Sequence, residues 1–186
     1  SNYNVNILSN SHLYVNHSSM SNIGDGFLSN STLTIEDSSI SVSGMLKLYS
    51  AHTEIIGSIL NYTSTINLHG GLVTNGTSIA LIDSRVNSSA DIVFKVLDKS
   101  SLYIENCTLE NIGSTTGEYS QRGLYIEDSQ AIIYHSRISS KSNAVMLYSA
   151  SNITIGHSHI TASYVSILAN NSKLVHVFNS TLRRIN

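Results

Sequence analysis

One eight-residue pattern recurs eight times along the chain, and it constrains the fold more than any other feature. The copies approximate one template, apolar, any, apolar, any, any, Ser, any, apolar, and the sixth position is Ser in seven copies and Cys in the other. The copies occupy residues 13–20, 33–40, 53–60, 79–86, 102–109, 131–138, 153–160 and 175–182. Their sixth positions, called anchors below, are separated by 20, 20, 26, 23, 29, 22 and 22 residues. This spacing indicates a repeat of 20–22 residues with insertions in the third, fourth and fifth intervals.

Alternation inside the pattern has a period of two, which predicts β-strands, and no segment sustains the 3.6-residue period of a helix. The apolar positions form three inward columns that begin with Leu13, Val15 and Met20. A single coil cannot enclose a core, so successive coils are expected to stack and bury one face of every strand. The sequence therefore predicts an all-β, single-stranded parallel β-helix (β-solenoid) of about eight coils with inserted loops. Residues 1–186 would form one domain, roughly 38 Å long if strands lie about 4.8 Å apart.

The period and the three short strands per coil resemble the right-handed parallel β-helix of the pectin-lyase-like superfold. A left-handed β-helix would need a strict hexapeptide repeat, which this sequence lacks. Ser and Asn make up 54 of the 186 residues, and autotransporter passengers and phage spikes look similar in this respect. The resemblance implies the fold and leaves the function to be argued from particular sites.

Composition excludes several classes of function. The net charge is −2, with 10 Lys and Arg, which argues against a nucleic-acid binder that depends on phosphate contacts. No apolar stretch approaches the ~20 residues of a membrane span, so no membrane insertion is expected. The single cysteine excludes a disulfide scaffold and a multi-cysteine zinc site. Cys107 occupies an anchor position, which predicts a buried structural thiol and not a reactive nucleophile.

The residue before each anchor defines another column, called the corner column. Its turn-favouring residues predict a left-handed backbone at a corner: His17, Asp37, Gly57, Asp83, Asn106, His135, His157 and Asn179. His135 and His157 should be stacked neighbours, with His159 two residues on, and such imidazoles could ligate a metal. No acidic residue sits at that corner in those coils, so neither a metal nor another cofactor is predicted.

Carboxylates do not form an evident catalytic set. Glu36 and Glu105 share a column but lie three coils apart, roughly 14 Å, and Asp37 and Asp83 lie two coils apart, roughly 10 Å. These separations reach or exceed the ~5–9.5 Å useful in glycoside chemistry. No catalytic residue is therefore predicted.

Two expected insertions, residues 69–76 and 111–123, both follow the third strand of a coil and should leave the rod on the same side. Loops on a rigid scaffold often carry binding residues. In the second insertion Glu118, Tyr119, Gln121 and Arg122 would suit contact with a sugar or a protein, and a solvated loop is the alternative.

Nine Asn-x-Ser/Thr sequons are candidates for N-glycosylation, which requires an exposed acceptor in a secretory context. They lie at Asn16, Asn30, Asn61, Asn75, Asn87, Asn106, Asn152, Asn170 and Asn179. Asn61 and Asn87 follow their anchors by three residues and are expected to face outward at a corner, which makes them the best candidates. The sequons support an extracellular or cell-surface location.

These observations favour an extracellular, non-enzymatic β-helix that serves as a surface stalk, adhesin passenger or filament segment. The alternative is a carbohydrate-active or carbohydrate-binding β-helix, such as a lyase, epimerase or hydrolase. An ice-binding solenoid would need a regular Thr ladder, which is missing. Because open coil ends expose unpaired backbone groups, we expect self-association or neighbouring domains to cover them, and the chain to be a segment or a stacking protomer. A glycan or a host-surface molecule is the expected ligand class.

Overall fold

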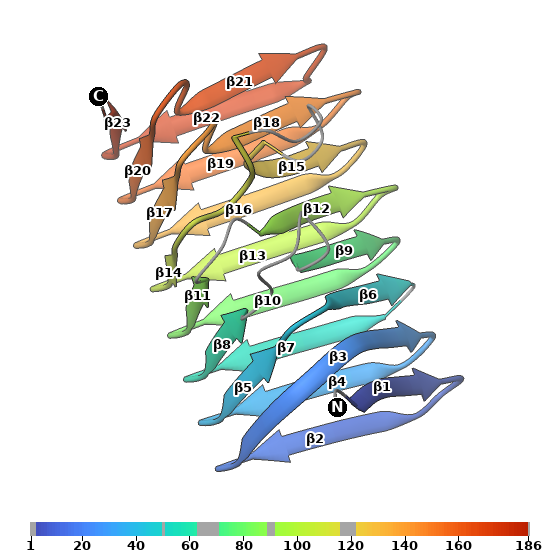
Figure 1. The fold of residues 1–186 in the computed structure, drawn as a ribbon. Helices are drawn as coiled ribbons and strands as arrows, with labels where there is room; N and C mark the ends of the chain where they lie inside the picture. The colour runs from blue at the N-terminus through green and yellow to red at the C-terminus, as the bar shows by residue number, and fades with distance from the viewer. Residues whose placement is uncertain (1–2, 50, 63–70, 89–91, 116–121, 186) are drawn as a thin grey trace.

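The computed structural model describes residues 3–49, 51–62, 71–88, 92–115 and 122–185. They form a parallel β-solenoid of about seven turns, with no helix among the residues described (Figure 1). Eight levels of strand are present, and because neighbouring levels are one turn apart, they make about seven turns. The predicted all-β fold is therefore confirmed.

The eight copies of the sequence pattern supply the eight parallel strands of one sheet. These middle strands are β2 (His12–Asn16), β4 (Thr32–Glu36), β7 (His52–Ile56), β10 (Ser78–Ile82), β13 (Ser101–Glu105), β16 (Gln130–Tyr134), β19 (Asn152–Gly156) and β22 (Leu174–Phe178). Their register aligns equivalent positions of the repeat, as in Leu13↔Leu33 and Ile155↔Val177. The register predicted from the repeat is thus the register of the sheet.

The other two strands of each level belong to one fifteen-stranded sheet. The strands that precede the middle strands are β1 (Tyr3–Leu8), the second half of β3 (Ser19–Ser29), β6 (Met45–Tyr49), β9 (Gly71–Asn75), β12 (Val93–Leu97), β15 (Leu124–Glu127), β18 (Val145–Tyr148) and β21 (Ile167–Asn170). Those that follow them are the first half of β3, β5 (Ser39–Val42), β8 (Ile59–Tyr62), β11 (Arg85–Ser88), β14 (Thr108–Leu109), β17 (Arg137–Ser140), β20 (His159–Ala162) and β23 (Thr181–Arg184). Strand β3 runs through both sets and so joins them into one sheet.

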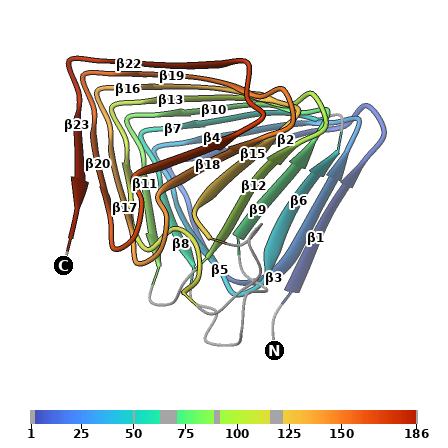
Figure 2. The ribbon, with the colours of Figure 1, turned by 90° about the horizontal axis from the view of Figure 1, so that it is seen from above.

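The solenoid is right-handed. Seen from above, the chain passes anticlockwise from the β18 side along β22 to β23, while it rises towards the viewer from the N-terminal to the C-terminal level (Figures 1 and 2). This is the hand expected for parallel strands joined by crossovers. It agrees with the hand that the sequence resemblance implied.

The predicted inward columns form the core. From Leu33 onward the column that begins with Leu13 is buried as far as Ile153, and the column of Ile40 is buried as far as Ile160. In the last level the same columns are open: Val175 is 41% exposed and Leu182 is 43% exposed, whereas Ile153 and Ile160 are fully buried. The difference follows from position, since no described coil lies beyond the last level.

A ladder of anchor residues runs along the first corner and satisfies the backbone there. The amide N–H of each anchor donates to the side chain of the anchor in the next coil, as in Ser38 N–H to Ser58 Oγ at 3.0 Å and Ser136 N–H to Ser158 Oγ at 3.1 Å. Each anchor hydroxyl in turn donates to the carbonyl two residues earlier, as Ser136 does to Tyr134 at 2.6 Å. The prediction that these inward hydroxyls find partners is confirmed from Ser18 to Ser180.

Cys107 takes the place of a serine in this ladder. Its Sγ accepts from the Ser84 N–H at 3.4 Å, and its own N–H donates to Ser136 Oγ at 3.0 Å. The residue is 3% exposed, and burial raises the pKa of the Cys107 thiol to about 11. A neutral, buried thiol is a poor nucleophile, so the structural role predicted for Cys107 is confirmed.

The expected insertion at 69–76 is partly wrong. Gly71–Asn75 is strand β9, which pairs with β6 and β12, so only the residues before it can be inserted, and residues 63–70 lie outside the described part of the chain. The error arose because Gly70-Gly71 and Asn75-Gly76 look like loop signals, whereas the strand is short and lies between them.

The described part of the chain contains no helix long and apolar enough to cross a bilayer.

Candidate functional site

The corner column, on the outside of the anchor ladder, holds the most concentrated set of chemically capable side chains. All eight of its residues have a left-handed backbone with φ between 45° and 58°, as the turn prediction required. From His17 to His157 the amide of each residue still donates across the corner to the next coil, for example His17 N–H to the Glu36 carbonyl at 3.1 Å. The corner therefore projects one side chain per coil from a backbone whose hydrogen bonds are already made.

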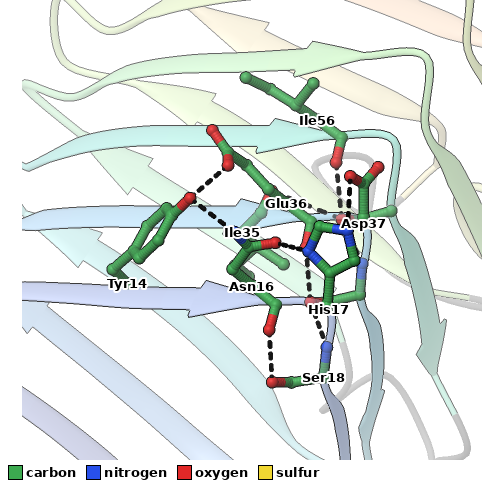
Figure 3. A network of polar contacts seen from close by, with 10 residues as sticks. Tyr14, Asn16, His17, Ser18, Ile35, Glu36, Asp37 and Ile56 are labelled. Atoms are coloured by element: carbon green, nitrogen blue, oxygen red, sulfur yellow. Dashed lines mark hydrogen bonds and ion pairs between the residues drawn. The ribbon is translucent and has the colours of Figure 1, made fainter.

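At the N-terminal end, five polar side chains from two coils form one connected network (Figure 3). The Tyr14 hydroxyl donates to the Glu36 carboxylate in the next coil and accepts from Asn16 Nδ2 at 2.9 Å. His17 Nε2 lies 3.6 Å from Asp37 Oδ2, and its Nδ1 contacts Asn16. The hydrogen bond to Glu36 raises the pKa of Tyr14, because the carboxylate stabilises the protonated phenol.

Asp37 and Asp83 stand two coils apart with Gly57 between them. Asp37 leans toward the following coil, since a Cβ atom on Gly57 would lie 2.4 Å from Asp37 Oδ1. Asp83 leans the same way, and its Oδ1 accepts from Asn106 Nδ2 at 2.6 Å. Because both carboxylates tilt in one direction, their separation stays near two coil spacings, roughly 10 Å.

In the C-terminal half the corner column becomes aromatic and basic. The rings of His135 and His157 are stacked at a centroid distance of 4.9 Å and an angle of 11°, as predicted. The ring of His157 also meets the edge of Phe178 at 5.5 Å. Tyr134 and Phe178 come within 6.0 Å of each other, because Gly156 between them has no side chain.

Four other carboxylates of the outer surface have side-chain partners. Glu105 accepts from the Tyr103 hydroxyl at 2.6 Å, and Glu127 accepts from Tyr125 at 3.1 Å. Glu110 pairs with Arg85 at 3.2 Å, and Glu54 lies 3.5 Å from His52. Among the described residues, no group of three or more His, Cys, Asp or Glu side chains is placed to hold a metal ion.

The two favoured sequon sites lie elsewhere than predicted. Asn61 and Asn87 are opposite each other within the strands β8 and β11, half-buried, and Asn87 Nδ2 donates to Asn61 Oδ1 at 3.1 Å. They are not at a corner, because β8 and β11 continue two residues past the ends of the repeat copies, to Tyr62 and Ser88. The sequon asparagines with exposed side chains are Asn16, Asn30, Asn106, Asn170 and Asn179, whereas Asn152 is half-buried at the start of β19 and Asn75 ends β9.

The loop candidates are only partly placed. Glu118, Tyr119 and Gln121 lie outside the described residues, and Arg122 is half-buried just before β15. Sequence reasoning did not anticipate the bond between Tyr14 and Glu36 or that between Tyr103 and Glu105. An alternating Tyr-x-Glu segment at residues 103–105 was the available signal, since it places both side chains on one face of a strand.

No protein-family model, curated protein or solved structure matches this chain.

Proposed function

We propose that this chain is a structural and adhesive β-solenoid of the extracellular space, working as a surface stalk, adhesin passenger or filament segment. The observation that carries the proposal is the unbroken stacking of coils. In the described residues the inward columns consist mainly of apolar residues and of the anchor ladder, so the interior serves to hold the rod together. The polar outer surface is what remains for contact with other molecules.

The absence of enzymatic activity is part of the proposal. It is supported by the wide separation of Asp37 and Asp83 and by the partners that hold Glu36 and Glu105. Incubation with pectins, alginates and glycosaminoglycans should release no product. Turnover that is lost in Asp37→Asn, Asp83→Asn or Glu105→Gln would favour the alternative, a carbohydrate-active β-helix.

Location can be tested on intact cells of the native host. Lys47 and Lys99 are exposed, so a membrane-impermeant amine reagent should label the chain on unbroken cells or in the medium. Mass spectrometry before and after glycan removal would then reveal whether any sequon is occupied. A chain that is labelled only after lysis would contradict the extracellular proposal.

We also propose that another domain or a second copy of the chain covers the end coils of the solenoid. The open columns at Val175 and Leu182 support coverage by a neighbouring domain or by a second copy. Sedimentation of the 186-residue chain should then show association that rises with concentration. A monomer at tens of micromolar, with both terminal coils protected from hydrogen exchange, would contradict it.

A further inference from the structure

A groove runs along the first corner over the last four coils. One wall is the C-terminal part of the corner column, and the other is the outward column of β14, β17, β20 and β23. The anchors Cys107, Ser136 and Ser158 form its floor, buried between the two walls. Each coil therefore contributes two side chains to the groove, one on either side of its anchor.

The two central coils place basic side chains at all four of these positions. His135 and Arg137 come from one coil, and His157 and His159 from the next. Arg137 and His159 are directly opposite in the register of β17 and β20, and the rings of His135 and His157 are stacked at 4.9 Å. The result is a two-by-two array of an arginine and three histidines whose rows are about 4.8 Å apart.

The flanking coils extend the groove with neutral groups. Asn106 and Thr108 lie on one side of the array, and Asn179 and Thr181 on the other. No carboxylate lines the groove among the described residues, although the corner column carries Asp37 and Asp83 in its N-terminal half. Although the net charge of the chain is −2, one arginine and three histidines lie together in this groove.

The nearest acids are held by other partners. Asp83 accepts from Asn106 at 2.6 Å, and Glu105 accepts from the Tyr103 hydroxyl at 2.6 Å. Glu110, on the same side as Arg137, pairs with Arg85 at 3.2 Å. Arg137 itself makes no ion pair with any residue that the structure describes. Its guanidinium is exposed and offers a planar fork suited to an oxyanion.

We propose that this groove binds a linear acidic polysaccharide, with its sulfate or carboxylate groups against the array of His135, Arg137, His157 and His159. The groove is open along the rod, so a chain can lie in it and meet the same chemistry at successive coils. Asn and Thr side chains at either end supply hydrogen bonds to sugar hydroxyls. The inference rests on the proposed adhesive function, for which it names the ligand class.

The test is binding of the whole chain to immobilised heparin, which is sulfated, and to polygalacturonate, which is carboxylated. Arg137→Gln should weaken binding about tenfold, whereas Arg137→Lys, which keeps the charge but loses the planar fork, should weaken it less. Arg85→Gln is the matched control, because Arg85 lies in the same outward column but outside the groove and is already paired. It should change binding less than about twofold. The double variant His135→Gln/His157→Gln should also weaken binding, because it removes two of the four side chains of the array.

The proposal is overturned if neither polysaccharide binds at about pH 5.5 and low salt, or if Arg85→Gln weakens binding as much as Arg137→Gln does. Equal binding of a DNA oligonucleotide of matched charge would show a general polyanion effect and would also overturn it. These exposed substitutions should leave the far-ultraviolet circular dichroism unchanged, which verifies the fold. Cell-surface labelling does not depend on the groove, so failure here and failure of the proposed function are distinguishable.

Discussion

Removing one hydroxyl from the anchor ladder should destabilise the solenoid, and Ser136→Ala is the most informative place to do so. Ser136 Oγ accepts from the Cys107 N–H at 3.0 Å and donates to the Tyr134 carbonyl at 2.6 Å. In the variant the Cys107 N–H is left buried without an acceptor, which costs about 1–3 kcal/mol. The Tyr134 carbonyl still accepts from the Asn106 N–H at 3.1 Å, so it adds little. The expected loss of unfolding free energy is about 2 kcal/mol.

Ser18→Ala provides a control in the same column. Ser18 is exposed in the first described coil, and its hydroxyl only donates, to the Asn16 carbonyl at 2.7 Å. No described N–H depends on it, so its removal should cost less than about 0.5 kcal/mol. Ser136→Cys should restore most of the loss, because the Cys107 thiol already accepts from Ser84 at 3.4 Å in this ladder.

Urea unfolding followed by far-ultraviolet circular dichroism measures these differences, provided that all variants share one denaturant slope. Hydrogen exchange at the Cys107 amide should also accelerate in Ser136→Ala. Ser58 and Ser136 are three coils apart, about 14 Å, so Ser58→Ala/Ser136→Ala should lose the sum of the two single losses within about 0.5 kcal/mol. If Ser136→Ala costs no more than Ser18→Ala, the ladder is not a stabilising element and the reasoning fails.

Three further outcomes follow from particular contacts. The Cys107 thiol should react with iodoacetamide only on unfolding. Because burial raises its folded pKa from 9.0 to about 11, the unfolded state ionises first, and stability should fall more steeply between about pH 9 and pH 11 in the native chain than in Cys107→Ser, in which only the tyrosines with a raised pKa contribute. Gly57→Ala should lower the free energy of unfolding by about 1–2 kcal/mol in chemical denaturation, because Gly57 has φ +58° and the new Cβ would lie 2.4 Å from Asp37 Oδ1. Asp37→Ala/Gly57→Ala should recover part of this loss, and no recovery would exclude the clash. Glu36→Gln should lower the pKa of Tyr14 toward its ordinary value, because Glu36 stabilises the protonated phenol; an unchanged alkaline absorbance titration would argue against the bond.

Strands and register could be predicted because each copy of the repeat carries its own alternation and its own anchor. The left-handed corner could be predicted too, since Asn, Asp and Gly recur at one position. The direction of side chains along the rod could not be predicted, because nothing in the spacing indicates that Asp37 leans over Gly57 or that Tyr14 reaches Glu36 in the next coil.

Strand ends were the other source of error. Asn61 and Asn87 were expected at a corner, but β8 and β11 continue through them, because sheet pairing to the neighbouring coils overrides the local turn signal of Asn. The sequence grouped the three histidines of the groove but not Arg137. Arg137 belongs to a column that is Ser, Ile or Thr in most coils, and only the register of β17 and β20 places it opposite His159.

The one-coil reach of the ladder has a mechanical consequence. Each anchor N–H is satisfied by the next coil alone, so pulling on one end of the rod loads a single coil boundary at a time. A coil of 22 residues released in this way would lengthen the tether by roughly 70 Å. Extension under force would then proceed one coil at a time from the end, and a rod of this kind would yield gradually while its remaining coils kept their shape.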